Sequence, residues 1–143
     1  PQRAPRRVDQ LILEEKLESL ARCVRRVEQK RPPSLDLLVA DPDIQDILVL
    51  NLGRAVQLCV DIGSHLISAT DAPAPQTMGE VFSTLAALGV ISDELAARLR
   101  AAVGFRNIAV HNHNRVDWAV VFAISTRHLD DFREFAAAVQ HDD

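Results

Sequence analysis

One short segment of the chain carries the residue types best suited to acid–base chemistry. Arg106 and Asn107 stand side by side, and His111 follows five residues after the arginine. His113 comes two residues later. Arginine is a charged planar fork that fits a phosphate, histidine can give or take a proton near neutral pH, and an amide can both donate and accept hydrogen bonds. These residue types suit phosphoryl-transfer chemistry on a nucleic acid, which needs no metal ion.

The spacing of the arginine and the histidine limits how they can act together. On a regular helix, residues five apart lie about 140° apart around the axis. Arg106 and His111 would then share a wide face without touching. A catalytic role therefore requires either a helix end between them or a second chain facing them. The alternative, which the residue types alone favour, is a surface arginine and a histidine near the last carbonyls of a helix.

The apolar positions of the chain predict the helices that must hold this segment. In the first of them, apolar residues from Leu13 to Val27 recur at intervals of four and three, the period of one helix face. No strand alternation and no glycine-rich phosphate loop occur in the sequence. The pattern predicts an all-α bundle of four long helices and one short helix. Their expected ranges are about 8–31, 42–69, 77–88, 92–112 and 117–139.

Capping residues mark where these helices should begin and end. Asp41 before Pro42 is typical of an N-cap followed by proline in the first turn. Ser92 and Asp117 are expected to cap the two C-terminal helices. The apolar period breaks at Asn112, so the helix with the Arg–His segment should end there. The segment would then lie near a helix C-terminus.

The second long helix has features that suggest a partner chain. It is apolar on more than one side, which indicates burial by more than its own chain, and Gly53 and Gly63 could let another backbone approach. Asp61 and His65 lie four residues apart on one face and could pair. This pair either satisfies itself as a structural feature, which is favoured, or supports the catalytic side chains from behind.

Composition and charge exclude several kinds of protein. The chain is 48% hydrophobic and 4% aromatic, and it contains no tyrosine. Its formal charge is −4, with 16 basic and 20 acidic residues. This balance is wrong for a protein that coats nucleic acid through charge alone, and it disfavours binding to anionic membranes. If RNA is the substrate, positive potential must be concentrated in a cleft.

The cysteines and the N-terminal segment point to an ordinary intracellular domain. Cys23 and Cys59 lie inside apolar helical patterns rather than in a metal-like cluster. Residues 1–7 contain two prolines and no apolar period, so they are expected to be a flexible lead-in, without the features of a signal peptide. Residues 8–140 are expected to form one domain. A reducing cytoplasm fits these features.

Several segments around the Arg–His pair carry a resemblance to a known family. The sequence Arg-Asn-Ile-Ala-Val-His is followed by Val-Asp-Trp, and three further stretches upstream match in order and position. These segments are 41–46, 59–67, 89–96, 104–111 and 116–118. From about residue 11 to 139, the chain resembles the HEPN superfamily. More narrowly, it resembles the HepT-like toxin ribonucleases that are paired with minimal nucleotidyltransferases.

This resemblance implies a fold, an activity and partners. The HEPN bundle works as a homodimer in which the Arg and His residues of both subunits line one composite cleft. The implied activity is endoribonucleolytic RNA cleavage without a metal or cofactor, in the toxin of a toxin–antitoxin pair. Arg106 and His111 would be the catalytic residues, and Asn107 would orient His111 or the phosphate. A minimal nucleotidyltransferase would be the antitoxin.

The sequence departs from the family pattern at one position. Many HepT-like toxins carry, two residues after the histidine, a tyrosine to which the nucleotidyltransferase attaches AMP. Here that position is His113, and no tyrosine is present. His113 is expected to be a polar loop residue, with a second proton-transfer or RNA-contacting role as the alternative. The lost tyrosine also keeps open a second function: a non-catalytic dimeric module that binds a nucleotidyltransferase or a nucleotide.

Overall fold

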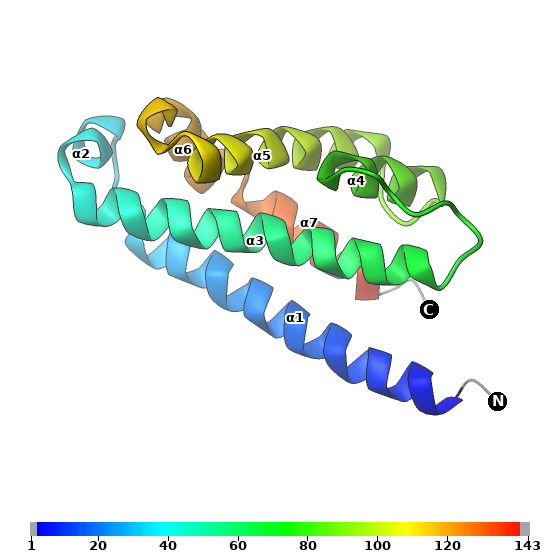
Figure 1. Ribbon diagram of the computed structural model, residues 1–143. Helices are drawn as coiled ribbons and strands as arrows, with labels where there is room; N and C mark the ends of the chain where they lie inside the picture. Colours follow the sequence, from blue (N-terminus) through cyan, green and yellow to red (C-terminus); the bar gives the residue numbers. More distant parts are fainter. Residues whose placement is uncertain (1–2, 141–143) are drawn as a thin grey trace.

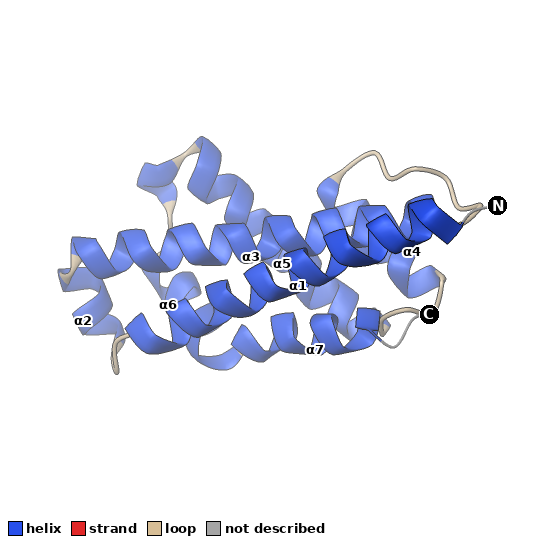
Figure 2. Cartoon of the chain, turned by 90° about the horizontal axis from the view of Figure 1, so that it is seen from below, coloured by secondary structure: helices blue, strands red, loops and turns tan. Residues whose placement is uncertain are grey.

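The computed structural model describes residues 3–140, with side chains from Asp9 onward, and every regular element in that range is helical (Figure 2). The all-α prediction is therefore confirmed for this part of the chain. Seven α-helices and one 3-10 helix occur within it. They are α1 (Arg3–Lys30), α2 (Leu35–Ala40), α3 (Pro42–Ser68), α4 (Met78–Ala87), α5 (Asp93–His111), η1 (His113–Arg115), α6 (Trp118–Arg127) and α7 (Leu129–Gln140).

The long helix α3 is the centre of the bundle. It lies between α1 on one side and the layer of α4 and α5 on the other, with α7 behind it (Figure 1). Side chains from α1 through α7 form one continuous core. Phe82 of α4 meets Phe135 of α7 edge to face, with ring centroids 6.0 Å apart, a favourable aromatic geometry. The candidate segment on α5 is therefore attached to a rigid scaffold.

The predicted caps form as expected. Asp41 accepts hydrogen bonds from the backbone N–H groups of Asp43 and Ile44 at 3.0 and 3.2 Å, and Ser92 accepts one from Leu95 at 3.1 Å. Each satisfies donors that a helix N-terminus leaves unpaired. These local bonds explain why the boundaries of α3 and α5 could be predicted.

The last predicted helix is in fact two. α6 ends at Arg127 and α7 starts at Leu129, and the short helix α2 is a further addition, so the expected total of four long helices and one short helix is wrong. At the break, the Ser125 carbonyl accepts a hydrogen bond from Nη1 of Arg31 at 2.7 Å. The Ser125 hydroxyl bonds back to Val121 within its own helix. A distant guanidinium thus satisfies a carbonyl that a continuous helix would have used.

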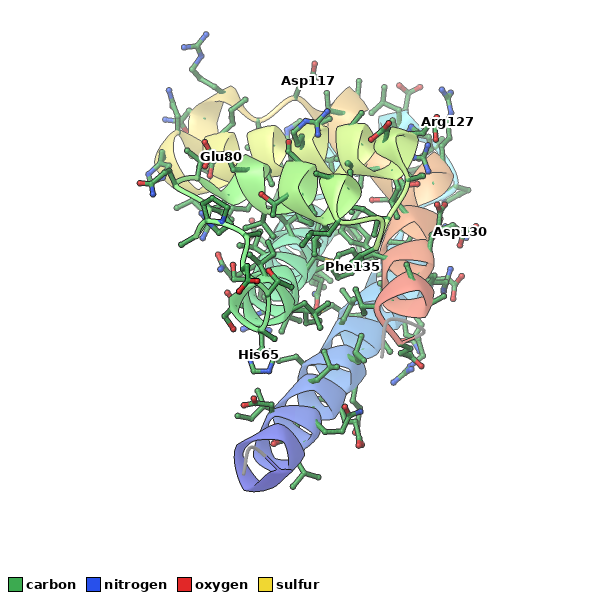
Figure 3. All side chains as sticks on the ribbon, turned by 90° about the vertical axis from the view of Figure 1, so that its right-hand side faces the viewer. His65, Glu80, Asp117, Arg127, Asp130 and Phe135 are labelled. Atoms are coloured by element: carbon green, nitrogen blue, oxygen red, sulfur yellow. The ribbon has the colours of Figure 1, made fainter. Side chains whose placement is uncertain are left out.

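The N-terminal boundary also differs from the prediction. α1 begins at Arg3, so 3–7 is helical, whereas a lead-in up to residue 7 was expected; residues 1–2 lie outside the described range. Pro5 is compatible with this start, because the N–H groups of a first helical turn have no partner within the helix. The early part of α1 diverges from α3 (Figures 1 and 3), and Leu11 and Ile12 on it are exposed.

The apolar character of α3 is accounted for largely within the chain. By length and composition, with an 18-residue window of mean hydropathy 1.4, α3 could cross a membrane. Nine of its residues are instead buried in the bundle. Gly63 is one of them: a Cβ there would lie 2.5 Å from Cγ1 of Val81 and 2.9 Å from Cδ1 of Leu85. The expectation that Gly63 admits a second chain is therefore wrong, since it admits α4.

Candidate active site

The C-terminal end of α5 extends beyond the packed core. Phe105 is the last buried residue of this helix, and His111 at its end is exposed. Ile108 and Val110 between them keep 47% and 57% of their surface exposed. The backbone leaves the helical conformation at Asn112, whose N–H still donates to the Ile108 carbonyl at 2.8 Å. The predicted helix end is confirmed, and it presents the segment to solvent beside two exposed aliphatic side chains.

Arg106 is held between three neighbours. It is half-buried, and its Cγ lies 4.0 Å from the position that a Cβ on Gly53 of α3 would occupy. Its Nη1 lies 3.8 Å from the Met78 sulfur and 3.4 Å from Oδ1 of Asn107. No ion pair among residues 9–140 involves this guanidinium. The Met78 sulfur and the Asn107 amide oxygen are weak, neutral acceptors. The other N–H groups of the guanidinium can therefore bind an anion.

His111 and His113 have different surroundings. His111 occupies the last turn of α5 and is exposed. His113 lies in η1, and its ring meets Trp118 edge to face with centroids 6.4 Å apart. On a regular helix Arg106 and His111 are separated by about 7.5 Å along the axis as well as by about 140° around it. Within one chain, the two side chains therefore start from different parts of the helix surface.

Asp61 and His65 do not pair with each other, so that expectation is wrong. Asp61 accepts a hydrogen bond from Gln57 at 2.9 Å and lies 3.8 Å from Lys16 Nζ on α1. His65 Nε2 lies 3.8 Å from Asp9, also on α1. Each residue therefore has a charged partner on α1, Lys16 for Asp61 and Asp9 for His65, in place of the partner four residues away on α3.

Figure 3 places His65 well away from the candidate segment. The side chain points from α3 toward α1 in the lower half of the view, whereas Asp117, which follows the Arg–His segment, lies at the top. The contacts of Asp61 and His65 thus give both residues a role in joining α1 to α3. No hydrogen bond or ion pair within the described residues joins either of them to Arg106 or His111.

Both cysteines are buried and unpaired with each other. Burial raises the pKa of the Cys59 thiol far above its usual value, which keeps it protonated and unreactive. The interpretation of the cysteines as small apolar core residues is confirmed.

Sequence reasoning did not find the neighbours of Arg106. Met78 lies 28 residues before it and Gly53 lies on a different helix. The sequence singled out Gly53 only as a place where another backbone could approach, so the packing of α4 and α3 against α5 was needed to identify both as neighbours of Arg106.

Comparison with known proteins places this chain in a family. The model of the HepT-like ribonucleases matches residues 13–139, nearly the whole chain. The chain belongs to the HepT-like ribonuclease family. This confirms the resemblance inferred from the Arg–His segment and its flanking stretches.

Individual members of the HepT-like family are similar over almost their full length. The mRNA nuclease HepT of Shewanella oneidensis is 30% identical over 129 residues, which cover 90% of this chain and 96% of that protein. A structure of the tri-AMPylated Shewanella oneidensis HEPN toxin in complex with its MNT antitoxin matches with a TM-score of 0.84, at 30% identity over 90% of this chain and 96% of that one. A toxin–antitoxin structure with AMP-PNP matches with a TM-score of 0.83, at 30% identity over 90% and 97% of the two chains.

Proposed function

We propose that this protein is the toxin of a toxin–antitoxin pair and cleaves RNA without a metal ion. Its membership of the HepT-like ribonucleases and its likeness to a named mRNA nuclease support the activity. The single observation that carries the proposed site is the guanidinium of Arg106. It contacts Met78 and Asn107 and has no carboxylate partner in the described range, and it lies on the helix that ends in exposed His111.

The site would be completed by a second copy of the chain. Arg106 and His111 of one chain point to different parts of the helix surface, and a facing subunit supplies the missing geometry. Ile108 and Val110, exposed between the two functional side chains, provide apolar surface that a partner subunit would cover. A homodimer would also double the positive charge around the substrate in a protein of net charge −4.

In the proposed reaction, His111 of one subunit takes the proton of a ribose 2′-hydroxyl. The 2′-oxygen attacks the adjacent phosphorus, and the bond from phosphorus to the 5′-oxygen breaks. His111 of the other subunit gives a proton to the departing 5′-oxygen. Arg106 binds the non-bridging oxygens and stabilises the transition-state charge, while Asn107 orients the guanidinium to which it is bonded. The products are a 2′,3′-cyclic phosphate and a 5′-hydroxyl.

The first experiment measures cleavage of a labelled RNA by purified protein. Arg106→Ala and His111→Ala should each lower the rate by about 100-fold or more, as expected for loss of a charge-stabilising group or a general acid–base group. His113→Asn should retain most of the activity, because the contact with Trp118 indicates a packing role. A His111→Ala protein that cuts RNA at the parent rate would refute the assignment.

A mixed dimer tests whether the site is shared. Arg106→Ala and His111→Ala chains are unfolded together, refolded, and compared with each variant refolded alone. The mixed dimer keeps one Arg106 and one His111, on different chains. In a composite cleft this pair restores charge stabilisation together with one of the two proton transfers, so the mixture should recover part of the activity. A site contained within one chain would recover none.

The partner is proposed to be a minimal nucleotidyltransferase, since the similar toxin structures contain an MNT antitoxin. Without a tyrosine in this chain, neutralisation would operate through complex formation or a different acceptor residue. Mass spectrometry after incubation with the partner and ATP separates these two routes. A protein that binds the partner tightly, yet cuts no RNA, would instead favour the non-catalytic module.

A further inference from the structure

A groove with arginines along it lies between α1 and α3, apart from the candidate active site. It encloses about 800 Å³. Arg22, Arg25 and Arg26 border it from α1, and Arg54 borders it from α3. No aspartate or glutamate is among its lining residues. The whole chain has more acidic than basic residues. A groove lined by four arginines and no carboxylate therefore differs from a surface on which both signs of charge are mixed. We call this feature the arginine groove.

Most of these arginines lack an ionic partner within the described range. Arg22 is bonded to Glu18 at 3.1 Å, but no ion pair there involves Arg25, Arg26 or Arg54. Residues three and four apart on a helix are neighbours, so Arg22 stands beside both Arg25 and Arg26. Like charges at these spacings destabilise a helix. A bound anion would remove this repulsion.

Arginines from both helices lie near Cys23, so their positive charges act on the same thiol. Burial raises the pKa of the Cys23 thiol, and the positive charges of Arg54 and Arg22 oppose that rise. Cys23 also lines the groove. Arg54 of α3 and Arg22 of α1 therefore act together across the groove, so an anion bound there would interact with charges from both walls.

The groove offers apolar surface as well as charge. Leu50 lines it with 51% of its surface exposed, and Ile47 and Leu58 also border it. A small inorganic anion would make no use of such residues. A nucleotide would, because it combines a phosphate with a sugar and a flat base. Amide side chains of Asn51 and Gln57 add polar groups to the same wall.

The arginine groove lies close to the candidate active site along α3. Gly53, against which Arg106 packs, is the residue directly before Arg54. Successive residues on a helix are about 100° apart, and a helix with its side chains is about 10–12 Å across. The two sites therefore occupy adjacent faces of one turn of α3, a short step for an extended polynucleotide.

We infer that the arginine groove binds phosphates and neighbouring sugars of the RNA strand away from the scissile position. The inference rests on the proposed ribonuclease function and names its substrate-binding surface. Its contacts are to the backbone, so binding there is independent of base sequence. It supplies the local positive potential that an acidic RNA-binding protein requires. The acidic surface of a protein partner is the competing occupant.

The test compares two double variants with the same change in charge. Arg26→Gln/Arg54→Gln alters the groove. Arg100→Gln/Arg127→Gln is the control, because both of its arginines are exposed and lie outside the groove. The binding measurements are made in the His111→Ala background, which removes the proposed proton-transfer group and leaves the groove intact. Fluorescence anisotropy with a single-stranded RNA 12-mer gives Kd over a range of KCl concentrations.

The groove variant should bind the 12-mer at least 10-fold more weakly than the control. The slope of log K against log salt should become shallower by about 1.4, since each phosphate contact to a single strand contributes about 0.7. Equal RNA affinity of the two variants would overturn the inference. So would unchanged RNA binding together with lost capture of the nucleotidyltransferase, which would assign the groove to a protein.

Cleavage kinetics separate this inference from the proposed function. With His111 restored, the groove variant should show a raised KM for the 12-mer, a near-parent kcat, and unchanged cleavage of a dinucleotide too short to reach the groove. A protein with groove-dependent RNA binding but no cleavage would refute the proposed nuclease and support the groove.

Discussion

The side chain of Arg106 on α5 lies beside Gly53 on α3: its Cγ is 4.0 Å from the point where a Cβ on that glycine would be. The stem of the arginine therefore passes close to the central helix of the bundle, while the guanidinium reaches Met78 and Asn107. A distance of 4.0 Å is an ordinary van der Waals contact, so the glycine is not required by a clash. Substitutions at Gly53 can therefore separate helix stability from the position of Arg106.

Gly53→Ala should stabilise the protein. Glycine inside a helix costs about 0.5–1 kcal/mol relative to alanine, and the added methyl group meets Arg106 at contact distance. Urea unfolding should show this gain, with RNA cleavage near the parent rate. Gly53→Leu should instead displace Arg106 and lower cleavage while the fold persists. Equal cleavage by the leucine variant would contradict the importance of this packing contact.

Gly63→Ala should have the opposite effect on stability, although it makes the same chemical change in the same helix. The new methyl group would meet Val81 at 2.5 Å and Leu85 at 2.9 Å. Overpacking of this kind typically costs about 1–3 kcal/mol, more than the gain in helix propensity. Urea unfolding measured alongside Gly53→Ala provides the matched comparison. A stabilised Gly63→Ala protein would show that α4 is less closely packed than described.

Arg31→Ala should destabilise the junction of α6 and α7. Nη1 of Arg31 donates to the Ser125 carbonyl at 2.7 Å, and Ser125 is fully buried. Hydrogen bonds to charged groups contribute about 1.5–3 kcal/mol, so a loss of that size is expected in thermal or urea unfolding. Arg127→Ala, which removes an exposed arginine near the same junction, should change stability by less than about 0.5 kcal/mol. Similar losses in both variants would discount the carbonyl contact.

Ile108→Ser/Val110→Ser should weaken the proposed homodimer. Full burial of such side chains contributes about 1.5–3 kcal/mol each. These two are about half-exposed in the single chain, so their loss should raise the dimer dissociation constant by about 30-fold, or about 2 kcal/mol. Analytical ultracentrifugation measures the constant, and RNA cleavage should fall with the dimer fraction.

Leu37→Ser/Val39→Ser on α2 is the control for this change, because those side chains are similarly exposed at 52% and 54%. It should leave the dimer intact. If both double variants dissociate equally, or neither does, the end of α5 is not the dimer contact.

The sequence by itself determined the features that depend on neighbouring residues. Helix class, the caps at Asp41 and Ser92, and the end of α5 at Asn112 all follow from backbone hydrogen bonds and apolar periodicity within a few positions. The order of the Arg–His segment and its flanking stretches was also enough to indicate the family. These features are local, so they can be read from the chain before it folds.

Only the tertiary structure decided which distant groups meet. Asp61 lay four residues from His65 in sequence, yet Lys16 on α1 offered a charged partner instead. The break between α6 and α7 depends on Arg31, 94 residues away from Ser125. The arginine groove likewise exists because α1 and α3 pack together. Such contacts depend on how whole helices pack, because the side chain that buries or neutralises a residue here belongs to a different helix.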